Sequence, residues 1–530
     1  MCGIWALFGI PVPYSVINNA MTNLKNRGPE GSRVLNEELY YLGFTRLAIN
    51  GLNNGGMQPM KSATYNWVCN GEIYNWLELA RRHSIETVSG SDCEILGPLF
   101  EKSSSLKSFF RSLDGVFAMV LINKTTAIIG RDPYGVRPLY VCDTGLNIFV
   151  SSERKAIPSH FSDYTYAFPP GHYMTIDLVT MKSSIVQYHT IPFLKNPEYL
   201  VENRLFRGLR TALERSVTKR MMTERPIAAL LSGGLDSSLI AALVQKTLVE
   251  YGAPPLQTFS IGFEGSEDLR CARIVATHIG SQHTEIIMTP DEFFKAIPYV
   301  VYDIESYDIT TVRASVGNWL VAREISRQSN CKVVFNGDGS DEVFGGYLYF
   351  RKCPSHEEFD EETSNLLENI HYFDVLRSDR CISSHGLEPR TPFLDKEFVN
   401  IAKSIPTEFL VHTPTHPEKW ALRSACMDLL PPEIVWRKKE AFSDGVSTVG
   451  KRCWYQECQQ RSKDIVGNWD ANEFSYLPPK TAEAYYYRKL YSRYFGSGLN
   501  TIPFLWMPKW SPETDDPSAK TLNPTAMDTS

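Results

Sequence analysis

One segment near the middle of the chain restricts the fold more than any other. An apolar run at residues 227–231 leads directly into Ser-Gly-Gly at 232–234, and a helical pattern begins at once. Gly252 then marks a typical helix end. The apolar residues of the pattern share one helix face: Ile240, Leu243, Val244 and Leu248. A strand, a glycine loop and a helix in this order indicate a βα unit with a ligand at the loop.

The loop at 232–237 has the chemistry of a phosphate site. Glycines let the backbone approach a phosphate closely, and a helix N-terminus offers N–H groups with partial positive charge. Ser232 and Ser237 add hydroxyl donors, whereas Asp236 suits a Mg²⁺ ion beside the phosphate. Asp236 or Ser237 is the expected N-cap of the helix. The loop contains no lysine, so it is not a Walker motif.

The character of the chain changes near residue 200. In the first part Ile4, Ala6 and Phe8 alternate with their neighbours, and a hairpin turn is expected at 123–126. Beyond residue 200, helical patterns alternate with short strand-like runs, which favours a parallel sheet. We place the boundary at 191–201. The expected domains are residues 2–190 and 200–510, and a polar, proline-containing flexible tail is expected at 511–530.

Composition and charge exclude several classes of function. Hydrophobic residues make up 43% of the chain and charged residues 22%, which indicates a globular protein. The net charge of −6 gives no basic footprint for nucleic acid, and the longest apolar run, at 116–122, is too short to span a membrane. The eleven cysteines are scattered and odd in number, and no targeting sequence is recognised. We therefore expect a cytoplasmic protein without nucleic-acid or membrane partners.

The second informative feature is the start of the chain, Met1-Cys2-Gly3. Methionine before a small residue is usually trimmed, which makes Cys2 the first residue. A terminal cysteine combines a thiol with an α-amine whose pKa is about 8. The neutral amine can accept the thiol proton and so activate the nucleophile without a histidine.

Later residues offer what a glutamine substrate needs beside such a nucleophile. The guanidinium of Arg46 matches the fork of an α-carboxylate. Glu72 and Asp92 are candidates to hold the α-ammonium group. Asn70 and the backbone of Gly71 can donate hydrogen bonds to a tetrahedral oxyanion.

These residues, with Arg27-Gly28-Pro29, resemble the class II, N-terminal-nucleophile glutamine amidotransferases. The loop at 232–237 resembles the pyrophosphate loop of the ATP pyrophosphatases. Joined in this order, the two halves resemble the glutamine-hydrolysing asparagine synthetases over nearly the whole chain. The resemblance implies an α/β protein overall. Its N-terminal domain is expected to be a four-layer αββα (α+β) amidotransferase, and its C-terminal α/β domain to carry a parallel sheet of the ATP pyrophosphatase type.

The resemblance also implies two half-reactions. Cys2 attacks the side-chain amide of L-glutamine and releases ammonia and glutamate. The second domain activates L-aspartate with ATP as β-aspartyl-AMP, and ammonia converts this intermediate into L-asparagine and AMP. The implied partners are these small molecules, with Mg²⁺ as cofactor, and a homodimer is expected.

Each site then receives its expected residues. The catalytic set is Cys2, Asn70, Gly71, Asp338 and Lys439. The glutamine-binding set is Arg46, Leu47, Ala48, Ile49, Asn50, Asn70, Gly71, Glu72 and Asp92. The ATP-binding set is Leu231, Ser232, Gly233, Gly234, Leu235, Asp236, Ser237, Ile261, Asn336 and Gly337. Thr310, Thr311 and Arg313 are expected to bind aspartate, and Asp236 and Asp341 to bind the metal.

The chain departs from the common family pattern at Asn26, Glu30 and Thr45, and Asp338 stands where many relatives have glutamate. Three alternatives stay open. A β-lactam synthetase-like enzyme cyclises a carboxylate without glutamine, and the intact set around Cys2 weighs against it. Amidation of another carboxylate is disfavoured by the aspartate-like segment at 310–313. A catalytically inactive nutrient-sensing homologue is disfavoured by the intact nucleophile and metal carboxylates.

Overall fold

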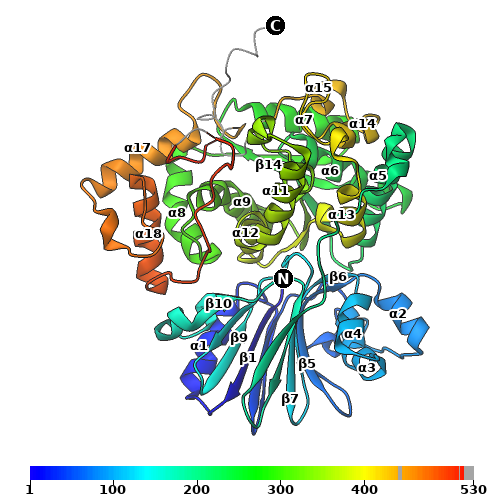
Figure 1. Cartoon of the computed structure of the whole chain (residues 1–530), viewed down its shortest axis with the longest axis vertical. Helices are drawn as coiled ribbons and strands as arrows, with labels where there is room; N and C mark the ends of the chain where they lie inside the picture. The colour runs from blue at the N-terminus through cyan, green and yellow to red at the C-terminus, as the bar shows by residue number, and fades with distance from the viewer. Residues whose placement is uncertain (440–444, 512–513, 519–530) are drawn as a thin grey trace.

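The computed structural model describes residues 1–439, 445–511 and 514–518. Its N-terminal part consists of two six-stranded antiparallel sheets, drawn in blue to cyan in Figure 1. Sheet A runs β10 (Thr165–Ala167), β8 (Tyr140–Asp143), β9 (Asn147–Ser151), β1 (Gly3–Gly9), β3 (Tyr40–Arg46) and β2 (Gly31–Glu37). Sheet B runs β12 (Ser183–Gln187), β11 (His172–Asp177), β7 (Thr126–Arg131), β6 (Gly115–Ile122), β5 (Asn66–Ile73) and β4 (Met60–Lys61).

Alternation along the strands separates four layers. Ile4 and Phe8 of β1 face the core between the two sheets, whereas Trp5 and Leu7 pack against α1 (Tyr14–Leu24). The outer face of sheet B packs against three helices: α2 (Trp76–His83), α3 (Leu96–Lys102) and α4 (Leu106–Ser112). The predicted αββα arrangement is confirmed. The predicted hairpin is also present, since β6 and β7 pair on either side of residues 123–125.

The C-terminal part is built on sheet C, whose five strands are all parallel, as predicted. Their order is β15 (Gln282–Ile287), β14 (Gln257–Gly262), β13 (Ile227–Leu230), β16 (Val333–Phe335) and β17 (Glu388–Arg390). One face packs against α5 (Glu202–Lys219), α6 (Leu235–Glu250) and α7 (Glu267–Ile279). The other packs against α8 (Pro290–Ile304), α9 (Ile309–Gln328) and α12 (Asp374–Ser383). Within the described ranges, no helix has the length and apolar character needed to cross a membrane.

The strand order of sheet C reverses between β13 and β16. Chain segments leaving these two strands diverge, so a crevice forms outside their carboxyl ends, where ligands bind in open α/β sheets. The loop at 231–234 leaves β13, and the loop at 336–339 leaves β16. Gly337 lets the two loops approach, because a Cβ there would lie 2.7 Å from the Ser237 amide nitrogen.

The start of α6 differs from the prediction. Its N-cap is Gly234, not Asp236 or Ser237, and no side chain caps the helix. The Ser237 hydroxyl turns back to the loop instead and lies 2.9 Å from the Ser232 hydroxyl. The first N–H groups of the helix are therefore left to a ligand. Gly252 follows the helix with a φ of 65°, as predicted for a helix end.

Only part of the tail that is expected to be flexible, residues 511 and 514–518, is described. Asp516 and Ser518 are buried, and the Asp516 carboxylate lies 2.9 Å from Arg313. Residues 514–518 thus pack on the C-terminal part, because a buried guanidinium attracts their carboxylate. Residues 512–513 and 519–530 of the predicted tail lie outside the described residues.

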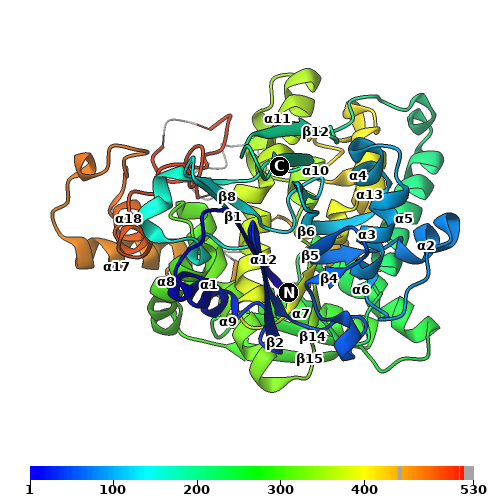
Figure 2. The same ribbon diagram turned by 90° about the horizontal axis from the view of Figure 1, so that it is seen from below.

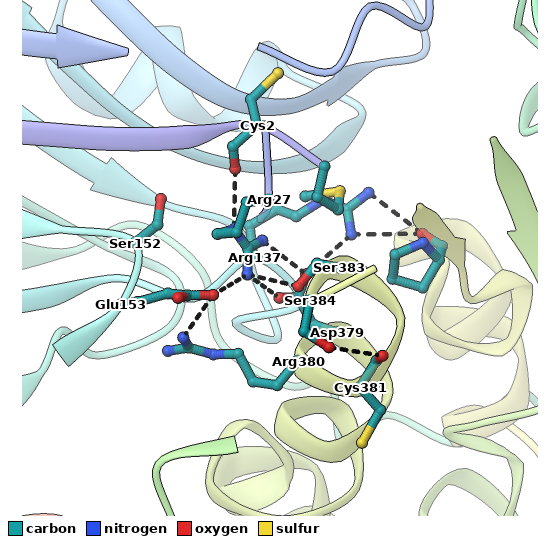
Figure 3. A network of polar contacts seen from close by, with 12 residues as sticks. Cys2, Arg27, Arg137, Ser152, Glu153, Asp379, Arg380, Cys381, Ser383 and Ser384 are labelled. Carbon is teal, nitrogen blue, oxygen red and sulfur yellow. Dashed lines mark hydrogen bonds and ion pairs between the residues drawn. The ribbon is translucent and has the colours of Figure 1, made fainter. Parts of the chain in front are cut away.

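A buried ionic network joins the two parts of the molecule, which lie one above the other in Figure 1 (Figure 3). Arg27 lies 3.0 Å from Glu153 in its own half and 2.8 Å from Asp379 of α12. Arg380, also on α12, lies 3.1 Å from Glu153. Burial alone raises the pKa of Glu153, but the cations Lys155, Arg380 and Arg27 outweigh it and lower that pKa to about 2. Glu153 is therefore the anionic centre of the interface.

Glu153→Gln is expected to destabilise the protein by about 3–5 kcal/mol at neutral pH, because it removes the one buried carboxylate that Arg27, Lys155 and Arg380 share. The folded-state pKa of Glu153 lies below its ordinary value of 4.5. Its stabilising contribution is therefore complete above pH 4.5 and declines as the pH falls towards 2. Urea denaturation across this range measures both effects. The control is Glu198→Gln, whose exposed partner Arg204 is 3.6 Å away and which should cost under about 1 kcal/mol. Equal stability of Glu153→Gln and wild type at pH 7 would contradict the expectation.

Candidate active sites

The pairing of β1 with β3 brings Cys2 to the residues predicted to bind glutamine. Gly3 is opposite Thr45, so Cys2 lies beside Arg46 at the same end of sheet A. The Cys2 thiol donates a hydrogen bond to the carbonyl of Leu47 at 3.5 Å. Burial raises the pKa of this thiol to about 11, so it needs a base to become a nucleophile.

Met1 precedes Cys2 and is completely buried. Its amine donates to the carbonyl of Leu387 in the C-terminal part at 3.0 Å, and burial lowers the pKa of this amine to about 5. While Met1 is present, the nitrogen of Cys2 is an amide and cannot act as a base. The amine predicted to activate the thiol exists only after Met1 is cleaved.

The side chain of Asn70, on β5, is buried from solvent. Asn70 and Val68 lie on the same face of the strand, and Val68 belongs to the core cluster that Cys2 contacts. Neither the oxygen nor the nitrogen of the Asn70 amide has a hydrogen-bond partner among the described residues. A buried amide of this kind is ready to donate to a bound oxyanion.

Glu72 and Asp92 form a buried acidic pair close to Asn70. Glu72 accepts a hydrogen bond from Asn50 at 2.7 Å, and Asp92 accepts one from the Ile73 amide at 2.7 Å. Burial and then repulsion from Asp92 raise the pKa of Glu72 well above its usual range. Burial also raises the pKa of Asp92 to about 6. A cationic ligand would stabilise the ionised forms of both groups.

Arg46 is held by the loop that follows it. It donates to the carbonyls of Asn53 at 2.8 Å and Gly51 at 2.5 Å. A guanidinium has five N–H donors, so part of the fork stays available for a carboxylate. The structure thus links the predicted glutamine residues in part: Cys2 with Leu47, Asn50 with Glu72, and Asp92 with the strand that carries Asn70, Gly71 and Glu72.

A second site lies at the crevice of sheet C, where a cavity of about 300 Å³ opens. Among the residues predicted for ATP, aspartate and metal binding and for catalysis in this half, its lining includes every one except Gly233. They are Leu231, Ser232, Gly234, Leu235, Asp236, Ser237, Ile261, Thr310, Thr311, Arg313, Asn336, Gly337, Asp338, Asp341 and Lys439. Gly233 lies against α7 instead, with a φ of 73° and a Cβ position only 2.5 Å from the Ala272 nitrogen.

Two lysines hold the predicted metal carboxylates. Lys419 lies 2.6 Å from Asp236 and 2.7 Å from Asp341, and Lys439 lies 2.7 Å from Asp341. Burial raises the pKa of Asp341, but the ammonium groups of Lys419 and Lys439 have the larger effect and lower this pKa far below its usual range. Lys419 was missed by the sequence analysis. No local pattern marks it, because it lies far from both carboxylates in the sequence and meets them only through the fold.

The donor set around Asp236 and Asp341 suits Mg²⁺. Magnesium is usually bound by one or two carboxylates, with substrate phosphates and water completing the octahedron. In the part of the chain that the structure describes, no group of three His, Cys, Asp or Glu residues could hold a metal by itself. The two carboxylates therefore fit an ion that arrives together with a phosphate ligand.

Asp338 is held in place by another residue that the sequence did not reveal. Arg377 of α12 lies 3.1 Å from Asp338 and 2.7 Å from Asp374. The second carboxylate oxygen of Asp338 is buried and has no hydrogen-bond partner among the described residues. Burial raises the pKa of Asp338, and Arg377 opposes the rise. One oxygen is thus fixed and the other is available to the cavity.

The three predicted aspartate-binding residues differ in whether their side chains already have partners. The Thr310 hydroxyl is buried and unpartnered within the described residues, whereas the Thr311 hydroxyl donates to Asp308 at 2.9 Å. Arg313 already forms ion pairs with Glu483 at 2.6 Å and with Asp516 at 2.9 Å. A carboxylate ligand that binds Arg313 must share it with these two anions.

Comparisons with known proteins agree with this two-site arrangement. The family described as glutamine amidotransferase domain matches residues 1–201, and the family described as asparagine synthase matches residues 208–360 and 352–501. The asparagine synthetase [glutamine-hydrolyzing] of Homo sapiens is 41% identical, and that of Gallus gallus 39% identical; each alignment covers 98% of both chains. A solved structure described as the allosteric regulatory enzyme of purine biosynthesis has a TM-score of 0.33 and 15% identity over 54% of this chain and 80% of its own, a weak likeness.

Binding of glutamine to the acidic pair is expected to weaken at low pH. The pKa of Asp92 is raised to about 6, so below that pH the pair loses the charge that holds an α-ammonium group. Calorimetric titration of Cys2→Ala between pH 5 and 8 should show Kd rising as the pH falls below 6. Asp92→Asn should bind more weakly at pH 8 and lose this pH dependence. A constant Kd from pH 5 to 8 in the parent variant would show that Asp92 does not hold the ammonium group.

Proposed function

The chain belongs to the glutamine-hydrolysing asparagine synthetases, whose reaction is the ATP-dependent amidation of L-aspartate to L-asparagine, and we propose that its two sites divide this reaction between Cys2 and the sheet C cavity. The observation that carries the proposal is the lining of that cavity. Predicted residues from five separate stretches of the sequence meet there, at 231–237, 261, 310–313, 336–341 and 439.

At the first site, Cys2 attacks the side-chain carbonyl carbon of glutamine. Its thiol proton passes to the α-amine that Cys2 gains on loss of Met1, and then to the departing ammonia. The Asn70 amide and the Gly71 backbone donate to the oxyanion that forms. Water then hydrolyses the glutamyl thioester, which gives glutamate and regenerates the thiol. Arg46, Glu72 and Asp92 hold the α-carboxylate and α-ammonium groups of the substrate.

At the second site, a β-carboxylate oxygen of aspartate attacks the α-phosphorus of ATP and pyrophosphate leaves. The open N-terminus of α6 and the hydroxyls of Ser232 and Ser237 bind the departing phosphates. Mg²⁺ on Asp236 and Asp341 neutralises phosphate charge when it is bound. Ammonia then attacks the acyl carbon of β-aspartyl-AMP, and AMP leaves. Asp338 takes a proton from the attacking ammonia; its buried second carboxylate oxygen, which has no partner among the described residues, supports this role.

The two lysines have a further part in the second site. They neutralise Asp236 and Asp341 in the free protein. With Asp236 and Asp341 holding a magnesium ion, the ammonium groups of Lys419 and Lys439 would be available to the phosphates. Each keeps an anionic partner throughout, so neither charge is left buried and unpaired.

We also propose a cytoplasmic location and a homodimeric assembly. None of the eleven cysteines, all of which lie in described residues, is part of a disulfide, which agrees with a reducing cytoplasm. A homodimer remains a proposal, for which native mass spectrometry is the test.

Cys2→Ala is expected to abolish glutamine hydrolysis and glutamine-dependent asparagine synthesis, because no other thiol replaces the nucleophile. Synthesis from ammonium chloride should continue at the wild-type rate, since the sheet C cavity is untouched. Amino-acid analysis of reactions with aspartate, ATP and Mg²⁺ measures both products. Glutamine-dependent synthesis by the variant at the wild-type rate would remove Cys2 from the mechanism. Mass spectrometry establishes first that Met1 is absent from the wild-type protein.

Lys419→Met is expected to reduce adenylate formation by about 10²–10³-fold, because it removes a preorganised cation from the phosphate site. ATP–pyrophosphate exchange in the presence of aspartate measures this step without a nitrogen source. Glutamine hydrolysis should be retained in the same preparation. Lys246→Met is the matched control, because its ammonium group pairs only with partly exposed Glu214. Unchanged exchange in Lys419→Met would place Lys419 outside the phosphate site.

A further inference from the structure

The loop at residues 47–51, which we call the clamp loop, contains four of the nine residues expected to bind glutamine. It follows Arg46 directly and ends at Gly51, whose carbonyl accepts a hydrogen bond from the Arg46 guanidinium. Gly51 has a φ of 59°, and a Cβ there would lie 2.5 Å from the Ser89 carbonyl oxygen. The loop therefore sets the direction of the Arg46 side chain, and whatever holds the loop also holds Arg46.

Arg225 of the C-terminal part holds the first half of the clamp loop. Its Nε donates to the carbonyl of Ala48 at 2.8 Å, and its Nη2 donates to Glu30 at 2.9 Å. The other carboxylate oxygen of Glu30 accepts from the Ala48 amide at 2.8 Å. Both backbone groups of Ala48 are thus fixed by one ion pair, and the cation of that pair comes from the other half of the molecule.

Glu224 holds the second half of the clamp loop. Its amide donates to the carbonyl of Ile49 at 3.0 Å, and its carboxylate accepts from the Gly51 amide at 2.5 Å. The N–H and C=O of Gly51 are therefore both occupied, one by Glu224 and one by Arg46. A shift of Glu224 moves the peptide that carries the second contact of Arg46.

The segment that supplies these contacts is itself rigid. Arg225 is followed by Pro226, whose carbonyl accepts from the Lys332 amide at 3.1 Å, and then by β13, the central strand of sheet C. The same strand leads into the phosphate loop at 231–234. The clamp loop is thus fastened to the segment that leads directly into the central strand of sheet C.

We propose that Glu224 and Arg225 are positioning residues for the glutaminase site, which the synthetase half completes by holding the clamp loop and, through it, Arg46. The inference rests on the proposed role of Arg46 and Cys2 in glutamine hydrolysis. Neither Glu224 nor Arg225 touches the substrate. Their effect falls on the α-carboxylate of glutamine, so it appears in substrate binding more than in the bond-breaking step.

Arg225→Ala is the first test, made in the full-length chain. The side chain is partly exposed, so its loss is compatible with folding. The KM for glutamine in the hydrolysis reaction should rise about tenfold, as expected for losing one or two hydrogen bonds that hold the loop. The kcat should change less than about twofold, because Cys2 and Asn70 are not disturbed. Ammonium-dependent asparagine synthesis should keep its wild-type kinetics.

Two variants make the result specific. Arg225→Lys keeps the charge near Glu30 but loses the fork that reaches Ala48, so it should lie between wild type and alanine. Lys396→Ala is the matched control. Lys396 also crosses between the halves, to the carbonyl of Leu113 at 3.0 Å, but it does not touch the clamp loop. It should leave the KM for glutamine unchanged. An equal rise in Arg225→Ala and Lys396→Ala, or a KM unchanged in Arg225→Ala, would overturn the inference.

A binding experiment separates this inference from the proposed function. In the Cys2→Ala background, calorimetry with glutamine should give a Kd about tenfold higher when Arg225→Ala is added. This result supports the positioning role even if Cys2 proves not to be the nucleophile. An unchanged Kd contradicts the positioning role even if Cys2-dependent hydrolysis is confirmed. Glu224→Ala, which removes the side-chain acceptor of the Gly51 amide, provides the same comparison should Arg225→Ala fail to fold.

Discussion

The structure depends on charges buried between its two halves. Arg27, Glu153, Asp379 and Arg380 are almost completely removed from water, and removing any one of them takes a buried partner from at least one of the others. Such a network adds little net stability compared with an apolar interface, but it tolerates only one alignment of its members. It therefore fixes how the sandwich meets sheet C. The view from below shows β1, which begins just after Cys2, lying across α12, the helix that carries Asp379 and Arg380 (Figure 2).

This fixed alignment is what lets one half complete the site of the other. Arg390 of β17 lies 3.4 Å from Glu72, so a cation of the synthetase half balances the acidic pair of the amidotransferase half. Glu224 and Arg225 hold the clamp loop from the same side. Arg390 belongs to a strand of sheet C, and Glu224 and Arg225 lie just before its central strand, β13. The crevice of that sheet and the pocket around Cys2 are thus built on one rigid support.

The sequence was informative where a site is made by neighbouring residues. The run at 227–237 predicted its strand, loop and helix because glycine placement and apolar spacing are local signals. The alternation at Ile4, Ala6 and Phe8 likewise predicted a strand, whereas the four-layer sandwich was implied by the family resemblance. The sequence was silent where partners are distant. Lys419, Arg377 and Arg27 resemble ordinary surface cations in sequence, and only the fold brings them to Asp236, Asp338 and Asp379. The predicted N-cap of α6 was wrong, because the helix begins after Gly234 and the Ser237 hydroxyl forms a hydrogen bond with Ser232.

The lysines at Asp236 and Asp341 have a practical consequence. In many metalloproteins a chelator unfolds the site, because the emptied carboxylates repel each other. Here two ammonium groups take the place of the divalent charge, so the acidic centre is neutral without any ion. The magnesium ion that we propose would thus serve the nucleotide and not the fold. The protein should keep its shape in EDTA, and it can be stored and purified free of metal.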